Sequence, residues 1–281
     1  LDSSRNNCEY GENSMMGWRP AMILEGDHFR CNLHYPNDPS IQLFTHVMDI
    51  FEETIDQYQH DVVIDHHPFC GGVVAALPYE SHGILQRKDN PTTKLSTCWF
   101  GFYDQIISYH HPTQEMVLIR LICPKNRKDP SILDEPPADI FQPSPTKKAK
   151  AAITFDFDCP QHIYMHRVYD IKDRIDSGEL YQVNLSHRCQ FPLKSPPKDI
   201  YRQLRKVNPT CFSSFIRQGD DYVLSNSPER LFSLRDRHIQ TRPIKGTIQR
   251  GKTPKEDLAN QQTLLNSTKD LVSALIKSNN K

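Results

Sequence analysis

Residues 241–247 read Thr-Arg-Pro-Ile-Lys-Gly-Thr, and the segment Ser-Pro-Glu-Arg at residues 227–230 lies shortly before them. Pro243 fixes φ on one side of Lys245, and Gly246 lets the backbone come close to a ligand on the other side. An amine on such a segment is held in place, whereas an ordinary surface lysine moves freely in solvent. Glu229 is predicted to lie on an adjacent strand. Lys245 and Glu229 are therefore a candidate nucleophile and a candidate proton donor.

Both side chains also have a simpler interpretation. A lysine at the edge of a strand is usually solvated, and Lys245 taken alone fits that description. Glu229 could form a salt bridge with Arg230 or Arg242. The flanking proline, glycine and threonine favour the catalytic interpretation of Lys245, because a solvated lysine needs none of them.

Composition limits the classes of function. The 281 residues are enough for one large domain or two ordinary ones. The 34 basic and 34 acidic residues give no net charge, which argues against nucleic acid or an anionic membrane as a partner. No apolar run approaches the roughly 18 residues of a membrane span, and the first residues do not resemble a signal peptide. The eight cysteines are scattered singly, which favours reduced thiols in the cytosol. We expect a soluble cytoplasmic protein.

The pattern of apolar residues predicts mixed secondary structure. It predicts helices over residues 41–58, from Asp158 to Gly178, and over 198–206. The second of these helices should bury Tyr164, Val168, Ile171 and Ile175. The predicted strands are 14–24 with a turn at Arg19-Pro20, a strand after the Gly71-Gly72 bend, 98–109, 116–123, 180–191, 212–217 and a pair within 221–241.

Strands outnumber helices and do not alternate with them regularly. This order favours an α+β fold, a two-sheet β-sandwich with helices outside, over a doubly wound fold. A Pro- and Lys-rich linker at residues 141–152 is predicted to separate an N-terminal region, 1–140, from a second region, 153–281.

Three motifs in order, residues 178–188, 225–234 and 241–251, resemble the chorismate-binding family. Residues 1–4, 13–22, 68–80 and 99–107 fit it as well. The family includes component I of anthranilate synthase and of aminodeoxychorismate synthase. The resemblance implies a fold like that of anthranilate synthase component I, incomplete at the C-terminus.

The resemblance also implies a reaction. Lysine in the Pro-Ile-Lys-Gly-Thr motif is typical of the aminodeoxychorismate branch, whereas anthranilate synthases tend to carry alanine there. Lys245 would add at C2 of chorismate as the 4-hydroxyl departs with a proton from Glu229, and ammonia would then enter at C4 and expel the lysine. Gly246 and Thr247 would bind a substrate carboxylate. Ammonia would come from a glutamine amidotransferase, and the product, 4-amino-4-deoxychorismate, leads to p-aminobenzoate and folate.

A second site is implied near the N-terminus, where relatives have a tryptophan pocket. One wall would be Ser3, Tyr10, Gly11, Glu12 and Asn13, and the other Cys211, Phe212 and Ser213. Glu12 replaces an arginine of some relatives, and Cys211 replaces a common proline. A simple core contact between the two segments is the alternative interpretation.

Histidine pairs suggest a competing class of function. Asp65-His66-His67 is similar to the metal-binding signature of some phosphoesterases, and His110-His111 is a second pair. The further aspartates of that signature are not found, so we expect a polar loop.

Magnesium is expected from the family, but its ligands are expected to be missing. Ser273 stands where relatives carry a glutamate that binds the ion, and a hydroxyl does not replace a carboxylate on this hard cation. We therefore expect the isolated chain to be inactive. Three hypotheses remain: part of an aminodeoxychorismate synthase, a catalytically dead relative that binds an amidotransferase or tryptophan, or a truncated product without a stable fold. Anthranilate synthase activity is the alternative reaction.

Overall fold

The computed structural model describes residues 1–3, 11–56, 62–79, 81, 97–121, 154–193, 195–235, 237–241, 244 and 246–267. The chain divides into two compact units, one made of Leu1–Gln142 and Leu204–Lys281 and the other of Pro143–Gln203. The predicted linker at 141–152 lies outside the described residues, and the domain division that it implies stays a prediction.

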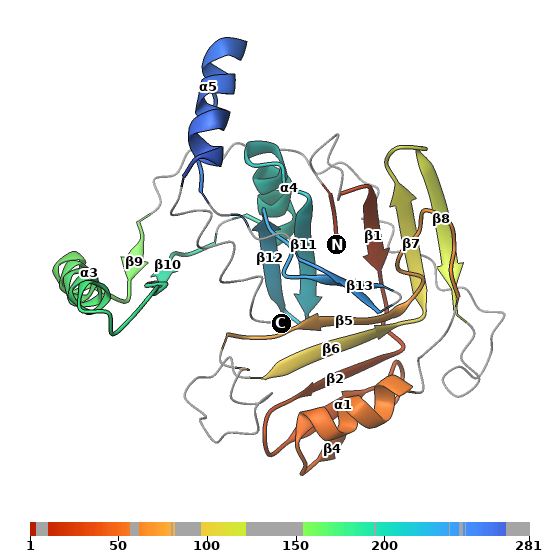
Figure 1. Cartoon of the computed structure of the whole chain (residues 1–281). Coiled ribbons are helices and arrows are strands. Elements are labelled where there is room, and N and C mark those ends of the chain that lie inside the picture. The colour runs from red at the N-terminus through yellow and green to blue at the C-terminus, as the bar shows by residue number, and fades with distance from the viewer. Residues whose placement is uncertain are drawn as a thin grey trace. The chain divides into compact units, whose positions relative to one another are not determined.

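The largest sheet has five antiparallel strands in the order β4-β3-β2-β6-β5 (Figure 1). The strands are β2 (Met22–Gly26), β3 (Cys31–His34), β4 (Ile41–Leu43), β5 (Gly72–Ala76) and β6 (Cys98–Tyr103). The predicted Gly-Gly bend before β5 is confirmed, because Gly71 and Gly72 have φ of 131° and 121°. These angles favour glycine because a side chain would be strained there.

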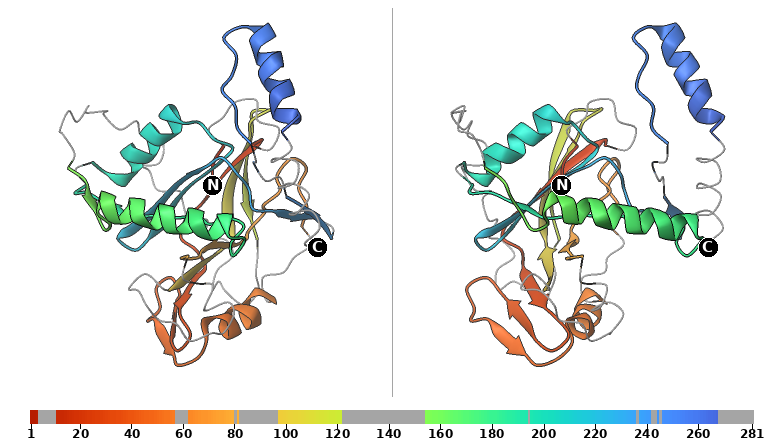
Figure 2. Two further views of the ribbon diagram at one scale, coloured as in Figure 1. Left: turned by 60° about the vertical axis from the view of Figure 1, so that its left-hand side comes forward. Right: turned by 90° about the vertical axis from the view of Figure 1, so that its left-hand side faces the viewer.

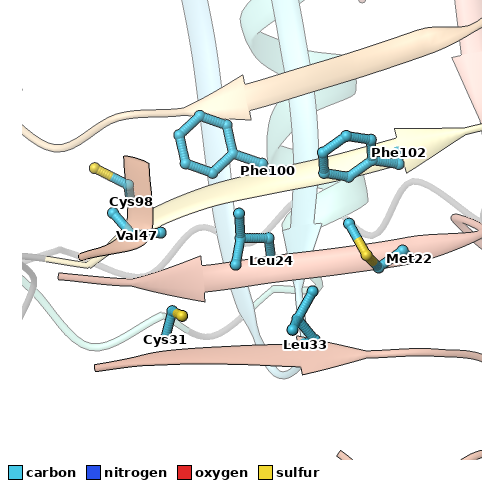
Figure 3. Close-up of a cluster of buried hydrophobic side chains, with 8 residues drawn as sticks. All are labelled: Met22, Leu24, Cys31, Leu33, Val47, Cys98, Phe100 and Phe102. Atoms are coloured by element: carbon cyan, nitrogen blue, oxygen red, sulfur yellow. The ribbon is translucent and has the colours of Figure 1, made fainter. Parts of the chain in front are cut away.

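One face of this sheet carries the hydrophobic core. Met22 and Leu24 from β2 and Phe100 and Phe102 from β6 point to the same side of the sheet (Figure 3). Helix α1 (Val47–Ile55) packs against them, with the ring of Phe51 centred 4.4 Å from that of Phe100. Alternation of buried and half-buried residues along β2 produces this one-sided core.

The helix predicted over residues 41–58 is shorter than expected. Residues 41–43 form β4, whose backbone pairs with β3. His46 then caps α1, because its Nδ1 accepts a hydrogen bond from the Met48 N–H at 3.2 Å. The apolar stripe correctly indicated a helix. The first residues of the predicted helix, 41–43, instead form a strand that pairs with β3.

A second antiparallel sheet has the order β1-β7-β8, with β1 (Asn13–Gly17), β7 (Gln105–His110) and β8 (Glu115–Arg120). The predicted strand over 98–109 is therefore two strands, which separate at Asp104 and join different sheets. The turn predicted at Arg19-Pro20 is confirmed, since β1 ends before it and β2 begins after it. The predicted α+β class is confirmed, since the described residues form both helices and antiparallel sheets.

The Pro143–Gln203 unit contains β9 (Asp156–Phe157), helix α3 (Gln161–Asp176) and β10 (Cys189–Gln190), and most of α4 (Pro197–Val207) (Figure 2). No described residue of α3 is buried. The predicted face is nevertheless visible, since Tyr164, Val168 and Ile171 are half-buried, whereas Ile175 is 38% exposed. The prediction that this face is buried is therefore wrong, although three of its four residues are half-buried.

Two further details of this unit differ from expectation. Pro160 rather than Asp158 is the N-cap residue of α3, and the Asp158 carboxylate accepts a hydrogen bond from the Arg188 N–H at 2.8 Å. The strand predicted over 180–191 is confined to β10, which pairs with β9. Alternation predicts a strand only where a partner strand is present, and among the described residues β9 pairs with Cys189 and Gln190 alone in this stretch.

The chain continues with the hairpin β11 (Phe212–Gln218) and β12 (Asp221–Ser227), the short hairpin β13 (Ser233–Arg235) and β14 (His238–Gln240), and helix α5 (Pro254–Leu265). Helix α5 is not among the helices predicted from the sequence. Its signal is Thr253-Pro254-Lys255-Glu256, since the Thr253 Oγ1 accepts from the Glu256 N–H at 3.2 Å.

Candidate functional site

Glu229 lies two residues after the end of β12, and not on a strand as predicted, at a bend held by Ser227. The Ser227 hydroxyl donates to the carbonyl oxygen of Glu229 at 2.8 Å, and the Glu229 N–H lies 3.3 Å from the same hydroxyl oxygen. Serine two residues before a turning residue commonly forms such a local bond. The bend therefore fixes the backbone from which the Glu229 carboxylate projects.

Three hydrogen bonds join this bend to the segment that begins the lysine motif. The Ile244 N–H donates to Oε1 of Glu229 at 3.1 Å. The Thr241 hydroxyl donates to the Leu231 carbonyl at 2.8 Å, and Arg230 donates to Oε1 of Gln240 at 2.7 Å. Residues 229–231 therefore lie beside Gln240, Thr241 and Ile244.

The predicted site residues are only partly described. Lys245 lies outside the described residues, as do Arg242 and Pro243. Glu229 contacts the backbone of Ile244, the residue that precedes Lys245 in the sequence. Gly246 is half-buried and Thr247 is exposed. Their predicted contacts with a substrate carboxylate stay predictions.

This site is open to solvent in the described structure. Glu229 is exposed, and Ile244 is 50% exposed. Water screens charges and favours the protonated form of a lysine, since burial is what lowers the pKa of an amine. The geometry brings the two segments together, but the described residues do not enclose them.

The two segments of the predicted tryptophan pocket do meet. Asp2 and Ser213 form an antiparallel bridge with backbone hydrogen bonds of 2.8 and 2.9 Å. Arg205 reinforces the contact through an ion pair with Asp2 at 2.5 Å. A Cβ on Gly11 would lie 3.2 Å from Cβ of Cys211 and 2.1 Å from Oγ of Ser3, so this position is too tight for a side chain.

The polar groups of these walls have different roles. The Ser213 hydroxyl donates to Oδ1 of Asn226 at 2.7 Å, so it ties β11 to β12. Ser3 Oγ and Asn13 Oδ1 are buried without a hydrogen-bond partner among the described residues. Glu12 is exposed, and the ring of Phe212 lies under the guanidinium of Arg230 at 5.7 Å. Tyr10 lies outside the described residues.

Cys211 is disulfide-bonded. Five further cysteines, Cys31, Cys70, Cys98, Cys159 and Cys189, are free. The prediction that all eight cysteines are reduced is therefore wrong. Single cysteines far apart in sequence gave no signal of a bridge, because pairing depends on distance in the folded chain.

The histidine pairs form part of the packing near β7. His67 is buried, and its Nδ1 lies 2.8 Å from the hydroxyl of buried Ser108. The rings of His66 and His110 are stacked with centroids 4.7 Å apart. No group of three or more His, Cys, Asp or Glu side chains in the described part of the chain is placed to hold a metal ion. The described residues thus do not fit a magnesium site, and Ser273 lies outside them.

None of the helices that can be described is long and apolar enough to cross a membrane.

The sequence pattern of the chorismate binding enzyme family matches residues 8–272, and the chain belongs to that family. In the solved structure of anthranilate synthase component I from Streptococcus pneumoniae TIGR4, the same fold covers 96% of this chain and 60% of that one. The TM-score is 0.71 at 20% sequence identity.

Particular relatives belong to two branches. Aminodeoxychorismate synthase component 1 of Klebsiella aerogenes is 32% identical over 208 residues, covering 73% of this chain and 45% of that protein. Anthranilate synthase alpha subunit 2 of Arabidopsis thaliana is 28% identical over 228 residues, covering 72% of this chain and 36% of that protein. The chain thus spans less than half the length of these two relatives. Their similar identities leave the branch unresolved.

Sequence reasoning missed the residues that hold the site together. Ser227 bonds locally to the Glu229 backbone, and Gln240 and Thr241 bond across the two segments. None of the three was predicted as a positioning residue. The signal for Ser227 was available, since serine followed by proline favours a local turn. Gln240 and Thr241 carried no comparable signal, because their bonds depend on the register of the β13–β14 hairpin.

Proposed function

We propose that this chain supplies the nucleophile and the proton donor of an aminodeoxychorismate synthase. The observation that carries the proposal is the hydrogen bond from the Ile244 N–H to the Glu229 carboxylate at 3.1 Å. It links two segments separated by fifteen positions in sequence, and the residue that follows Ile244 is Lys245. A carboxyl group beside the backbone of a lysine motif can act on the same bound substrate as that lysine.

The reaction would proceed by two substitutions. The neutral amine of Lys245 attacks C2 of chorismate, the ring double bonds shift, and the 4-hydroxyl leaves as water with the proton of Glu229. Ammonia then attacks C4, the double bonds shift back, and the bond between C2 and the lysine nitrogen breaks. The net change is replacement of a hydroxyl by an amino group with loss of water. No step is assigned to magnesium.

The choice of branch depends on Lys245. The Klebsiella aerogenes and Arabidopsis thaliana relatives belong to different branches and have similar identity to this chain, so overall similarity does not identify the branch. A nucleophilic lysine is needed for substitution at C4 through a covalent intermediate, whereas direct attack by ammonia at C2 needs none. Anthranilate formation is therefore the alternative function. The ammonia would come from an amidotransferase partner, as in the reaction expected of the family.

The test uses a chimaera, because the chain spans 45% of the Klebsiella aerogenes protein and 36% of the Arabidopsis thaliana protein. Residues 1–267 would be followed by the portion of the Klebsiella aerogenes protein that lies after its matched region. We expect the chimaera to convert chorismate and ammonia to 4-amino-4-deoxychorismate in the presence of magnesium. Lys245→Ala should lower the rate by about 10³-fold or more. The matched control Lys252→Ala changes an exposed lysine outside the motif and should leave the rate unchanged.

A covalent adduct gives an independent measurement. Without ammonia, mass spectrometry of the chimaera should find chorismate minus water on the peptide that contains Lys245, and Glu229→Gln should abolish it. Anthranilate as the main product would replace the proposed branch by the alternative one. A folded chimaera with neither product would favour a catalytically dead relative.

We also propose that the N-terminal segment and β11 bind an amino acid such as tryptophan. Two buried polar atoms in the predicted walls, Ser3 Oγ and Asn13 Oδ1, have no partner among the described residues, and buried polar groups are normally bonded. Calorimetric titration of the chain with tryptophan tests this. Binding that is lost in Ser3→Ala supports the site, whereas absence of binding would leave a simple core contact.

A further inference from the structure

Only two residues are buried among the described residues from 154 onward, and both are polar. Thr210 is 5% exposed and Ser213 is 2% exposed. Their hydroxyl groups meet at the side chain of Asn226. The Ser213 hydroxyl donates to Asn226 Oδ1 at 2.7 Å, and the Thr210 hydroxyl lies 3.0 Å from the same oxygen and 2.8 Å from Ser213 Oγ. Buried hydroxyl groups need such partners, because burial removes their hydrogen bonds to water.

The side-chain amide of Asn226 uses both its oxygen and its nitrogen. Oδ1 accepts from the buried hydroxyl groups, and Nδ2 donates to the backbone carbonyl of Asn208. These bonds fix the orientation of the amide, since a flip would place its donor against donors and its acceptor against an acceptor. Asn226 therefore ties the end of β12 to the chain segment that enters β11.

Ser213 is the fixed base of this network. Both of its backbone groups bond to Asp2, at 2.8 and 2.9 Å, and it is paired with Asn226 across the β11–β12 hairpin. Because its N–H and carbonyl are used by Asp2, Ser213 forms a non-hydrogen-bonded pair with Asn226. Side chains of such pairs lie close together on one face of the hairpin. β11 is therefore held at this position from both of its edges.

The bend that carries Glu229 follows this network directly. Ser227, the residue after Asn226, is the last of β12, and its hydroxyl donates to the Glu229 carbonyl at 2.8 Å. We propose that Asn226 is a positioning residue for the Glu229 carboxyl group, an inference that rests on the proposed function of Glu229 as proton donor. Asn226 acts through Ser227 rather than on the substrate.

The exposure of Glu229 explains why such a support is needed. Glu229 is exposed, and no apolar side chain is buried among the described residues from 154 onward, so apolar packing does not fix the bend. Proton transfer to a departing hydroxyl requires the carboxyl group at hydrogen-bond distance, and a small displacement of the donor slows the reaction. A network of buried, bonded polar groups supplies rigidity in place of an apolar core.

Hydrogen exchange of the 281-residue chain tests the support without reference to turnover. Asn226→Ala removes the acceptor of the buried hydroxyls, and Thr210→Val removes one hydroxyl at nearly constant shape. Each should speed exchange of the backbone amides of residues 224–230 by about tenfold, because the end of β12 opens more often. Thr210→Ser keeps a hydroxyl and should exchange like the wild type. Thr263→Val is the matched control, since it removes an exposed hydroxyl from α5.

Kinetics of the chimaera test the consequence for the reaction. Asn226→Ala should lower kcat by about tenfold and change KM for chorismate by less than about twofold, because Glu229 acts on the departing hydroxyl. In the Glu229→Gln chimaera the same change should lower kcat by less than about twofold, since no proton donor is left to position. Thr210→Val should also lower kcat, whereas Thr210→Ser should retain it. Circular dichroism verifies that each variant is folded, and the Thr210 pair decides if Asn226→Ala is not.

The outcomes separate this inference from the proposed function. Wild-type exchange in Asn226→Ala and Thr210→Val would overturn the inference. So would a wild-type kcat in these variants, or an equal loss of kcat with and without the Glu229 carboxyl. Faster exchange in a chain whose unsubstituted chimaera makes no aminated product would uphold the support of the bend and contradict the proposed function.

Discussion

The first 121 residues and the residues from 154 onward use apolar side chains in opposite ways. In the first region, Leu24 and Phe102 are fully buried between a five-stranded sheet and a helix. In the second, residues of the same type, such as Leu231 at 82% exposure, remain on the surface. The difference teaches that the stabilising core and the candidate chemistry lie in different segments. The first region buries many of its apolar side chains, whereas no apolar side chain among the described residues from 154 onward is buried.

The largest expected effect distinguishes these two regions directly. Phe102→Ala should lower the free energy of unfolding by about 3–5 kcal/mol, because it leaves a cavity in a fully buried position. Leu231→Ala removes an exposed side chain and should change it by less than about 0.5 kcal/mol. Urea denaturation followed by tryptophan fluorescence measures both. Similar losses in the two variants would show that the second region has a core of its own.

Two glycines with positive φ, one in each region, allow the packing of the two regions to be compared at single positions. A Cβ on Gly71 would lie 2.5 Å from Leu121 Cδ1 and 3.0 Å from the Tyr103 carbonyl, and the φ of this glycine is 131°. Strain and overpacking together should make Gly71→Ala cost about 2–4 kcal/mol. Gly178 has a φ of 77° with nothing within 4 Å, so Gly178→Ala should cost only about 1 kcal/mol. Thermal denaturation of the two variants measures both losses of stability. Equal losses would contradict the difference in packing around the two glycines.

Much of the fold was predictable from local signals, and the failures have a common cause. The Gly71-Gly72 bend, the turn before β2 and the α+β class followed from residues that act locally. The alternating segment 180–188 was assigned to a strand because alternation describes a possible strand and says nothing of its partner. The first turn of the predicted helix at 41–43 was lost to pairing with β3. Pairing between distant segments is what the sequence pattern does not specify.

The candidate site shows the same limit. Glu229 was identified from its motif, and its carboxylate does meet the segment of the lysine motif through the Ile244 N–H. The bonds of Gln240 and Thr241 that align these segments depend on hairpin register and could not be foreseen. The disulfide of Cys211 was missed for a related reason, because only the fold brings two distant cysteines together.

The smallest expected effect is a loss of stability of the first region at alkaline pH. Burial raises the pKa of Tyr103 to about 12, and it raises the pKa of the Cys98 thiol to about 11. Each folded value lies above the ordinary one, so the contribution of each group to stability is fully present below its ordinary pKa. For Tyr103 it is lost as the pH rises from 10 to about 12. The first region should therefore lose stability in strong alkali.

Tyr103→Phe isolates the tyrosine contribution, because phenylalanine does not titrate and Cys98 is retained. From pH 8 to pH 10.5 the wild-type chain should lose about 1 kcal/mol more unfolding free energy than the variant. Urea midpoints at the two pH values give the difference. An equal loss in both chains would mean that water reaches the Tyr103 hydroxyl in the folded state. Tyr103 would then be less shielded from water than its burial indicates, and the contrast with the exposed apolar residues from 154 onward would be weaker.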